Sequence, residues 1–459
     1  MLPQKFRWAH LLLASCVFYA AFIPVYILIL FFTIIIDYIA GIMIENSEGK
    51  RKKNYLIISI IANVGVLAVF KYYNFFTANI NDLLHSIDIT TRTVPYLDII
   101  LPIGLSFHTF QAMSYTIEVY RGNQKAERHF GIYSLYVMFY PQLVAGPIER
   151  PQNLLHQFTE KHPFDSQKLL DGLRLMLWGL FKKVVIADRV ALYVSTVYEF
   201  PAHYHYLNLI LATLFFSIQI YCDFSGYSDM AIGAAKAMGF DLMTNFNRPY
   251  FSKNIQEFWK KWHISLSTWF RDYLYISLGG NRKGIKRMYV NVAIVFLVSG
   301  FWHGANWTYI IWGAIHALLI VIFMLYTFNR NATKTLPPLR KMIAVVSTFL
   351  LVTFAWIFFR ADSVQNAILI CRNIVTGYNT VPFQLALRSV TGAIKFPQSA
   401  SVISVVMIAL MFMVEKRLAP DLATLNKKPY ADIVFCGAIL SMIVLFGVFN
   451  SNSFIYFQF

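Results

Sequence analysis

Residues 307–328 read WTYIIWGAIHALLIVIFMLYTF, an almost wholly apolar stretch of 22 residues. A helix needs about 20 consecutive, mostly apolar residues to cross a bilayer, so this stretch predicts a transmembrane helix. His316 is its only histidine or charged side chain. Ionisable side chains are costly inside a membrane and usually face the protein interior or a water-filled cavity. We therefore expect an integral membrane protein with a functional histidine here; a satisfied core histidine is the alternative.

The rest of the chain has the same apolar character. Hydrophobic residues make up 57% of its 459 residues and charged residues only 14%, whereas an average soluble domain is about one quarter charged. Apolar blocks recur from Leu11 to Phe449 without a long polar segment or an internal repeat. The sequence predicts an all-α integral membrane protein in which residues 1–459 form one domain. We expect about nine to eleven transmembrane segments, plus short re-entrant or amphipathic helices.

Basic residues outnumber acidic ones and give a net charge of +17. They occur in short runs between apolar blocks, at residues 50–53, 282–287, 330–341 and 427–428. A basic excess in short loops follows the positive-inside rule, so it indicates membrane lipids as partners and no nucleic acid. The four cysteines form no Cys-x-x-Cys pair, and we predict neither a metal site nor a disulfide framework.

The polar middle of the chain contains a tryptophan-rich stretch. Residues 255–270 read IQEFWKKWHISLSTWF. At the helical period its three tryptophans lie on one arc, with Lys260 and Lys261 outside it. A tryptophan-rich face flanked by lysines is typical of a helix in the headgroup layer. His263 is at the edge of this arc, where it either faces a protein cavity or anchors the helix at the interface.

A short break precedes the helix of His316. Residues 301–307 read FWHGANW, and the glycine and Asn306 indicate a turn between two apolar segments. His303 is then near a membrane boundary, about 20 Å from His316 if the intervening residues are helical. We expect His303 and Asn306 either to line an entrance to a cavity or to form the turn.

A third polar cluster lies beside a membrane segment, in residues 221–230, YCDFSGYSDM. Asp223, Ser225 and Asp229 with a central glycine predict a broken helix that lines a cavity. Structural polar packing is the alternative. The spacing of these side chains fits no metal site.

Taken together, these stretches closely resemble the membrane-bound O-acyltransferase (MBOAT) superfamily, specifically its alginate O-acetylation branch. The motifs that carry the resemblance are QLVAGPIER (142–150), YCDFSGYSD (221–229), NFNRPY (245–250), EFWKKWHISLSTWFRDYLYISLGGNR (257–282) and SGFWHGANWTYIIWGAIH (299–316). The resemblance implies a helical bundle with re-entrant and interfacial helices around a central cavity. It also implies that His316 is the buried catalytic histidine and His263 the second catalytic position.

The resemblance implies an acyltransferase in the bacterial inner membrane. Such an enzyme would move an acetyl group from a cytoplasmic donor, acetyl-coenzyme A, across the membrane for O-acetylation of an exported polysaccharide such as alginate. A periplasmic or extracellular acetyltransferase would receive the group, and no cofactor would stay bound. Sibling enzymes acting on peptidoglycan, cellulose or teichoic acid are the near alternative. A proton-coupled transporter or flippase, with His316, Asp223 and Asp229 as a proton relay, is the alternative from another class.

Our sequence-based hypothesis for the chemistry gives each histidine a role. His316 acts as general base toward the acceptor, and His263 positions the donor or donates a hydrogen bond to the acyl carbonyl oxygen. Arg271 and Asp272 pair beside the cavity. Four cations are candidates for binding the donor phosphates, with anionic lipid as the alternative ligand: Lys260, Lys261, Arg282 and Lys283.

Overall fold

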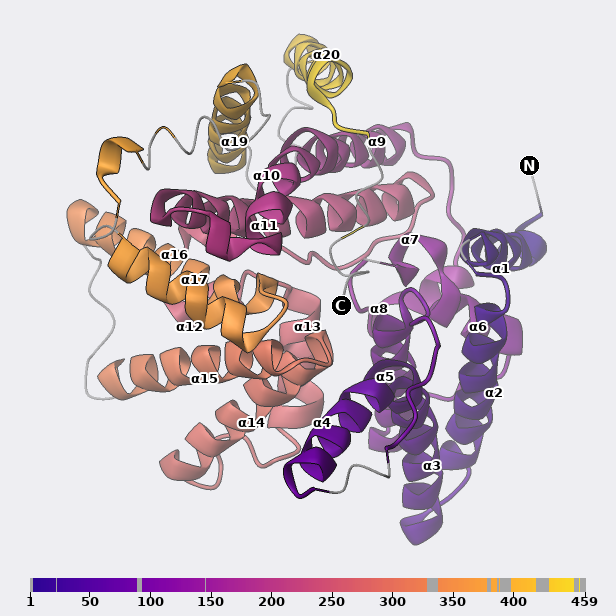
Figure 1. The fold of residues 1–459 in the computed structure, drawn as a ribbon. Coiled ribbons are helices and arrows are strands. Elements are labelled where there is room, and N and C mark those ends of the chain that lie inside the picture. The colour runs from indigo at the N-terminus through magenta and orange to yellow at the C-terminus, as the bar shows by residue number, and fades with distance from the viewer. Residues whose placement is uncertain are drawn as a thin grey trace. The chain divides into compact units, whose positions relative to one another are not determined.

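The computed structural model describes residues 3–21, 23–88, 93–144, 146–327, 337–377, 381–385, 388, 398–417, 429–449 and 454. Every regular element in these residues is a helix (Figure 1), so the all-α prediction is confirmed. The chain divides into two compact units, and each is described by itself. Unit 1 comprises Met1–Ser166 with Met238–Met243, and unit 2 comprises Gln167–Ala237 with Thr244–Phe459. The single membrane domain stays a prediction.

Unit 1 is a bundle of helices. Its elements are α1 (Gln4–Ala20), α2 (Tyr26–Glu45), α3 (Gly49–Leu67), a π-helical turn (Ala68–Tyr72), α4 (Tyr73–Ser86), α5 (Leu105–Arg121), α6 (Phe130–Met138), α7 (Tyr140–Leu143), α8 (Pro151–Leu154) and a 3₁₀ turn (His156–Phe158). A buried polar contact joins α2 to α3, because Asp37 accepts hydrogen bonds from Ser59 Oγ at 2.6 Å and from Asn63 Nδ2 at 2.8 Å. Contacts of this kind hold apolar helices together where no hydrophobic driving force acts between them.

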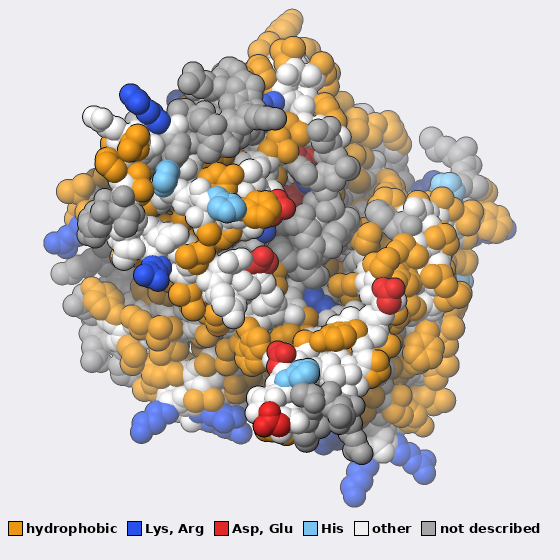
Figure 2. Space-filling model, viewed as in Figure 1, with side chains coloured by type: hydrophobic (Ala, Val, Ile, Leu, Met, Phe, Trp, Pro, Cys, Tyr) orange, Lys and Arg blue, Asp and Glu red, His pale blue; other side chains and the backbone are white. Residues whose placement is uncertain are grey.

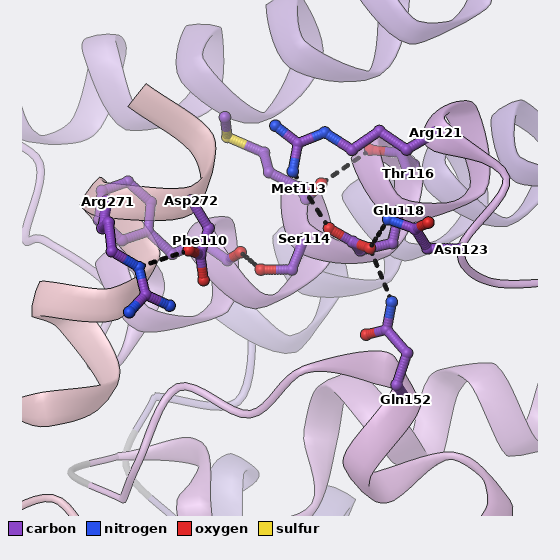
Figure 3. A network of polar contacts seen from close by, with 10 residues as sticks. All are labelled: Phe110, Met113, Ser114, Thr116, Glu118, Arg121, Asn123, Gln152, Arg271 and Asp272. Atoms are coloured by element: carbon purple, nitrogen blue, oxygen red, sulfur yellow. Dashed lines mark hydrogen bonds and ion pairs between the residues drawn. The ribbon is translucent and has the colours of Figure 1, made fainter. Parts of the chain in front are cut away.

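A second polar contact fastens the end of α5 to α8. Glu118 accepts hydrogen bonds from Asn123 Nδ2 at 2.9 Å and from Gln152 Nε2 at 2.7 Å, as Figure 3 shows. The helix ends at Gly122, whose φ of +79° suits a residue without a Cβ. The turn after α5 is therefore fixed by side chains as well as by the backbone.

Unit 2 contains the stretches that the sequence singled out. Its elements are α9 (Ser166–Leu180), the π-helical η3 (Phe181–Ala187), α10 (Asp188–Glu199), η4 (Pro201–His203), α11 (Tyr206–Ala237), η5 (Pro249–Phe251), α12 (Ile255–Trp259), α13 (Ile264–Trp269), the π-helical η6 (Phe270–Tyr275), α14 (Ile285–His303), α15 (Trp307–Thr327), α16 (Pro338–Arg360), α17 (Val364–Thr376), α19 (Gln398–Arg417) and α20 (Pro429–Phe446). Helix α14 packs on α15, α15 on α16, and α11 on α16 and α17.

Six helices in the described residues are long and apolar enough to cross a membrane. They are Tyr26–Glu45, Gly49–Ser86, Tyr206–Ala237, Ile285–His303, Trp307–Thr327 and Pro338–Arg360. Their outer faces expose large apolar side chains such as Ile39 and Val298, and Figure 2 shows hydrophobic side chains over much of one face. The membrane fold is confirmed, while the number of full crossings stays a prediction. The basic run at residues 427–428 and most of the run at 330–341 lie outside the described residues.

The tryptophan-rich stretch is not the continuous helix that its periodicity predicts. It forms two short helices, α12 and α13, separated at His263, whose φ is +44°. The backbone of the preceding segment replaces the missing helical bonds: Asn247 N donates to Lys261 O at 3.0 Å, and Ile264 N donates to Asn245 O at 2.9 Å. The prediction was wrong because these bonds come from residues outside the periodic stretch.

The polar cluster of residues 221–230 also differs from its prediction. It lies inside the uninterrupted helix α11 and does not break it. The carboxylates of Asp223 and Asp229 pair with buried lysines of η3. The helix therefore needs no water-filled break to hydrate them. Gly226 allows the close approach: a Cβ there would lie only 2.7 Å from the Gly179 carbonyl oxygen.

Candidate functional site

His316 lies inside unit 2, on the apolar helix α15, and none of its surface is exposed. Close packing of α14 against α15 makes this position possible, since Cβ atoms on Gly300 and Gly313 would collide with the backbone of the facing helix. Gly313 and His316 are three residues apart and therefore share a face of α15. The sequence-based expectation of a buried histidine facing the protein interior is confirmed.

Aromatic rings surround the His316 imidazole. The ring centroids lie at 4.9 Å (Trp312), 5.0 Å (Trp259), 6.2 Å (Phe296), 6.3 Å (Trp356) and 6.5 Å (Phe258). Trp259 Nε1 donates a hydrogen bond to His316 Nδ1 at 3.3 Å. Within the described residues, His316 Nε2 and the indole nitrogens of Trp312 and Trp356 are buried without a hydrogen-bond partner. Unsatisfied buried polar atoms are rare, so each of these three nitrogens has a hydrogen bond available for a ligand or an ordered water.

His263 is also fully buried and lies between α12 and α13. Its Nδ1 lies 3.1 Å from Asn245 Oδ1, and the Phe224 ring packs edge-on against its imidazole at 4.6 Å. The same Asn245 oxygen accepts hydrogen bonds from Ser265 N at 3.3 Å and Ser265 Oγ at 3.0 Å. Burial lowers the pKa of His263 to about 3, so the imidazole is neutral at physiological pH.

The two histidines belong to one aromatic cluster. Phe258 lies 6.5 Å from the His316 ring and 5.5 Å from the Trp262 ring. Trp262 in turn lies 5.1 Å from Phe246, whose ring is 6.5 Å from His263. The structure thus brings both predicted catalytic residues into the same core, joined by stacked and edge-on rings.

A cavity of about 610 Å³ lies beside this cluster, bounded by residues of α12 to α15 and η6. Trp259 and Phe296 line it and also contact the His316 ring. Its volume falls in the range of small-molecule sites, which are mostly apolar with a few polar groups. Lys260 and Arg271 are the cations of its wall. Arg271 Nε donates to Asp272 Oδ1 at 2.7 Å (Figure 3), which confirms the predicted pair.

His303 lies closer to His316 than the sequence suggests. Its ring is 5.1 Å from the Trp312 ring, which is itself 4.9 Å from His316, so the expected separation of about 20 Å was wrong. The reason is that residues 304–306 reverse the chain, and His303 belongs to the preceding helix α14. Asn306 forms the turn: its Oδ1 accepts from Thr308 N at 3.0 Å and its Nδ2 donates to Asp362 O at 2.9 Å.

The carboxylates of the polar cluster are engaged in a buried ionic network. Lys183 Nζ lies 2.8 Å from Asp223 Oδ1 and 2.7 Å from Asp188 Oδ1. Lys182 Nζ lies 2.7 Å from Asp229 Oδ2 and donates to Ser225 Oγ at 2.9 Å. These contacts agree with the structural alternative stated for Asp223, Ser225 and Asp229. Asp229 borders a small pocket of about 60 Å³.

The four candidate phosphate-binding cations do not converge on one pocket. Lys260 lines the cavity of 610 Å³. Lys261 pairs with Glu257 at 2.7 Å and lines a second pocket of about 540 Å³. Arg282 and Lys283 are exposed at the turn before α14. The second pocket is strongly basic, since five of its lining residues are cationic: Arg248, Lys253, Lys261, Lys341 and Lys416.

Residues 128–361 match the family described as MBOAT, membrane-bound O-acyltransferase. The chain is 40% identical over 368 residues to the "Probable alginate O-acetylase" of Pseudomonas aeruginosa, covering 79% of this chain and 69% of that protein. This chain belongs to the membrane-bound O-acyltransferase family. It is therefore an acyltransferase, and the matched region contains both buried histidines of the site.

Other relatives of this MBOAT protein have different names. The peptidoglycan O-acetyltransferase of Helicobacter pylori is 37% identical over 399 residues, which is 81% of this chain and 74% of that protein. The teichoic acid D-alanyltransferase of Bacillus subtilis is 31% identical over 274 residues, which is 56% of this chain and 68% of that protein.

Sequence reasoning missed four residues that shape the site of this MBOAT chain. Lys182 and Lys183 had a visible signal, because two adjacent lysines interrupt an apolar stretch and intramembrane charges are unusual. Asn245 and Trp259 had no such signal in the sequence apart from their places in the quoted motifs. Their roles depend on which nitrogen of each histidine they contact, and that requires the packed structure.

Proposed function

We propose that this MBOAT protein moves an acetyl group from a cytoplasmic donor across the bacterial inner membrane for O-acetylation of an exported polysaccharide. The observation that carries the proposal is the buried His316, with an unpartnered Nε2 among the described residues, behind two rings that line a cavity of about 610 Å³. Acyl transfer needs a group that moves a proton and a group that stabilises the oxyanion. Both buried histidines are candidates for these tasks.

Acetyl-coenzyme A is the proposed donor, and its phosphates suit a basic pocket. The pocket of about 540 Å³ combines five cations with one carboxylate, Glu257, and lysines are common phosphate ligands. Lys341 and Lys416 come from α16 and α19, two helices that the sequence did not link to the donor. We expect Lys341→Gln to raise the KM for acetyl-coenzyme A at low salt and leave kcat unchanged; an unchanged KM would place the phosphates elsewhere.

The proposed acceptor side is a separate periplasmic acetyltransferase, which passes the group to the polysaccharide. The names of the relatives support an exported polymer, with alginate favoured by the Pseudomonas aeruginosa protein and peptidoglycan by the Helicobacter pylori protein. The proton-coupled transporter is less well supported, because Asp223 and Asp229 already pair with buried lysines and are poorly suited to carry protons.

Donor turnover in liposomes tests the proposal. Purified protein is supplied with acetyl-coenzyme A labelled in the acetyl group, and free coenzyme and labelled acceptor are measured. His316→Ala should lower turnover by about 10²- to 10⁴-fold, the usual contribution of a proton-transferring group. The exposed His203 provides the matched control, since His203→Ala should keep full turnover. Wild-type turnover in His316→Ala would refute the role of His316, and no turnover by the native protein with its partner present would refute the donor.

A further inference from the structure

Helix α19 ends in two adjacent charged residues that line different pockets. Glu415 lines the small pocket of about 60 Å³, whose wall also includes the ion pair of Lys182 and Asp229. Lys416 is exposed and lines the basic pocket of about 540 Å³. Consecutive residues of an α-helix point about 100° apart, so the same turn of α19 forms part of both walls. A shift of this turn would therefore move Lys416 relative to the other cations of the basic pocket.

Tyr221 of α11 fastens this turn of α19 to the rest of unit 2. Its Oη donates a hydrogen bond to Glu415 Oε1 at 2.7 Å, and hydrogen bonds to carboxylates are stronger than those between neutral groups. One turn earlier on α19, Met411 Sδ lies 3.3 Å from Cys222 Sγ. Tyr221 and Met411 are almost entirely buried, so both contacts are shielded from solvent. Tyr221 therefore holds Glu415 in place, and with it the neighbouring Lys416.

Arg248 lines both pockets. Its Nη1 donates to the backbone oxygen of Glu415 at 3.5 Å. Its φ of +49° lies in the left-handed region, and Pro249 follows it. A residue with a side chain rarely adopts this conformation, and a following proline restricts the backbone further, so surrounding contacts must hold it. The structure thus keeps the Arg248 guanidinium beside the end of α19 and in the wall of the basic pocket.

We propose that Tyr221 and Glu415 are positioning residues for the basic pocket, because their hydrogen bond holds Lys416 in the wall that receives the donor phosphates. This hydrogen bond is the α19 latch. The proposal rests on the acyltransferase function and the donor site proposed above and deepens them. Neither Tyr221 nor Glu415 is among the described residues that line the basic pocket, so the latch acts on the donor through Lys416.

Electrostatics alone predicts the opposite effect for Glu415. A carboxylate close to five cations lowers the positive potential of their pocket, so its removal without any movement should tighten phosphate binding. Loss of the latch should instead weaken phosphate binding, because Lys416 then has to be ordered when the anion binds. The direction of the change therefore distinguishes the two explanations. Tyr221→Phe removes the hydrogen bond without any change in charge.

Binding of adenosine 3′,5′-bisphosphate, which carries phosphates like those of the coenzyme A nucleotide, tests the latch. Its dissociation constant is measured by calorimetry with the full chain in phosphatidylcholine nanodiscs at low salt, where phosphate contacts are least screened. Lys416→Gln and Tyr221→Phe should each weaken binding about tenfold, the size expected for one charge-assisted contact. The double variant should be little weaker than either single variant, since both changes remove the same contact.

Tyr193→Phe is the matched control for Tyr221→Phe. The Tyr193 side chain is also buried, and its Oη donates to a side-chain oxygen, Asn208 Oδ1, at 3.1 Å. It is not among the described residues that line either pocket, so this variant should bind the bisphosphate as the native protein does. Native affinity in Tyr221→Phe would overturn the latch.

Two variants of Glu415 give an independent test. Glu415→Gln keeps an oxygen that accepts from Tyr221 Oη, and it should bind the bisphosphate at least as tightly as the native protein does. Glu415→Ala loses the acceptor and should bind about tenfold more weakly. The unfolding midpoint of each variant is first compared with that of the native protein. Equal affinities of the two variants, or tighter binding by Glu415→Ala than by the native protein, would contradict the proposal.

The kinetic consequence is a rise in the KM for acetyl-coenzyme A with kcat unchanged, because contacts to the donor phosphates are the same before and during the reaction. The two proposals fail separately. Donor turnover with a native KM in Tyr221→Phe would refute the latch only. Bisphosphate binding that depends on Tyr221, in a protein that never consumes acetyl-coenzyme A, would refute the proposed function only. Loss of bisphosphate binding when phosphatidylglycerol replaces phosphatidylcholine would identify a lipid phosphate as the occupant and overturn the donor as its source. No bisphosphate binding by the native protein in phosphatidylcholine would overturn the anion site and the latch with it.

Discussion

Gly179 and Gly226 bring α9 and α11 into backbone contact. A Cβ on Gly179 would lie 2.5 Å from the Gly226 carbonyl oxygen, and one on Gly226 would lie 2.7 Å from that of Gly179. Gly172 and Gly233 repeat this contact seven residues away along both helices. Small residues at helix interfaces permit such approaches in membranes, and here the approach places Lys183 beside α11.

Gly226→Ala should therefore destabilise the protein. The added methyl group meets backbone, which cannot rotate away, and overpacking of this kind costs about 1–3 kcal/mol. The midpoint of thermal unfolding in detergent measures the effect. Gly65→Ala in α3 is the matched control, because a Cβ there meets nothing within 4 Å. Equal midpoints for the two variants would show that α9 and α11 do not approach as described.

The buried lysines give a second prediction about stability. Lys182→Met leaves the Asp229 carboxylate without its ion pair in a poorly hydrated site, and breaking a buried pair costs about 3–5 kcal/mol. The double variant Lys182→Met/Asp229→Leu should be more stable than Lys182→Met, since the Asp229 carboxylate is removed together with its partner. Lys261→Met breaks the more exposed pair with Glu257 and should cost about 1 kcal/mol or less. Denaturant or thermal unfolding in detergent compares the three, and a double variant as unstable as the single one would contradict the pairing.

The sequence predicts the class of protein and His316 because both depend on local composition. An apolar run of sufficient length must cross a membrane or be buried in the protein core. The single histidine within it must then face the protein interior or a cavity. The same local reasoning fails at His263. The spacing of the aromatic residues in 255–270 fits a continuous helix. The backbone groups of Asn245 and Asn247, however, form hydrogen bonds with backbone groups of this stretch that a continuous helix would use internally.

The polar cluster on α11 shows a second limit. Two aspartates in an apolar segment predict water or a break only when no cation is near. The cations come from η3, about forty residues earlier, so the prediction needed the packing of α9 on α11. Which charged side chains lie next to one another can be inferred from the sequence only once it is known which helices pack together.

The neutral, buried His263 predicts a pH dependence of stability. Burial lowers its pKa to about 3 from an ordinary value of 6.5, so the unfolded state binds the proton more readily than the folded state. Its contribution to stability is present above pH 6.5 and is lost as the pH falls toward 3. His263→Gln should therefore flatten the decline of the unfolding midpoint between pH 6.5 and pH 4.5. An unchanged slope in this variant would contradict the buried, neutral imidazole.

The last prediction concerns the cavity that Trp259 separates from His316. Val295 of α14 lines it, whereas Val298 of the same helix is 42% exposed on the outer face. Val295→Trp should fill much of the space and lower donor turnover at least tenfold, with KM rising more than kcat falls if the cavity binds the donor. Val298→Trp adds the same indole to the outer surface and should leave turnover within about twofold of the native rate, because surface changes away from a site rarely cost more than about 0.5 kcal/mol. Both variants are first checked for native unfolding midpoints. Full turnover by a stably folded Val295→Trp protein would show that neither the donor nor the acceptor uses this cavity, and the basic pocket would then be the place to look for the donor.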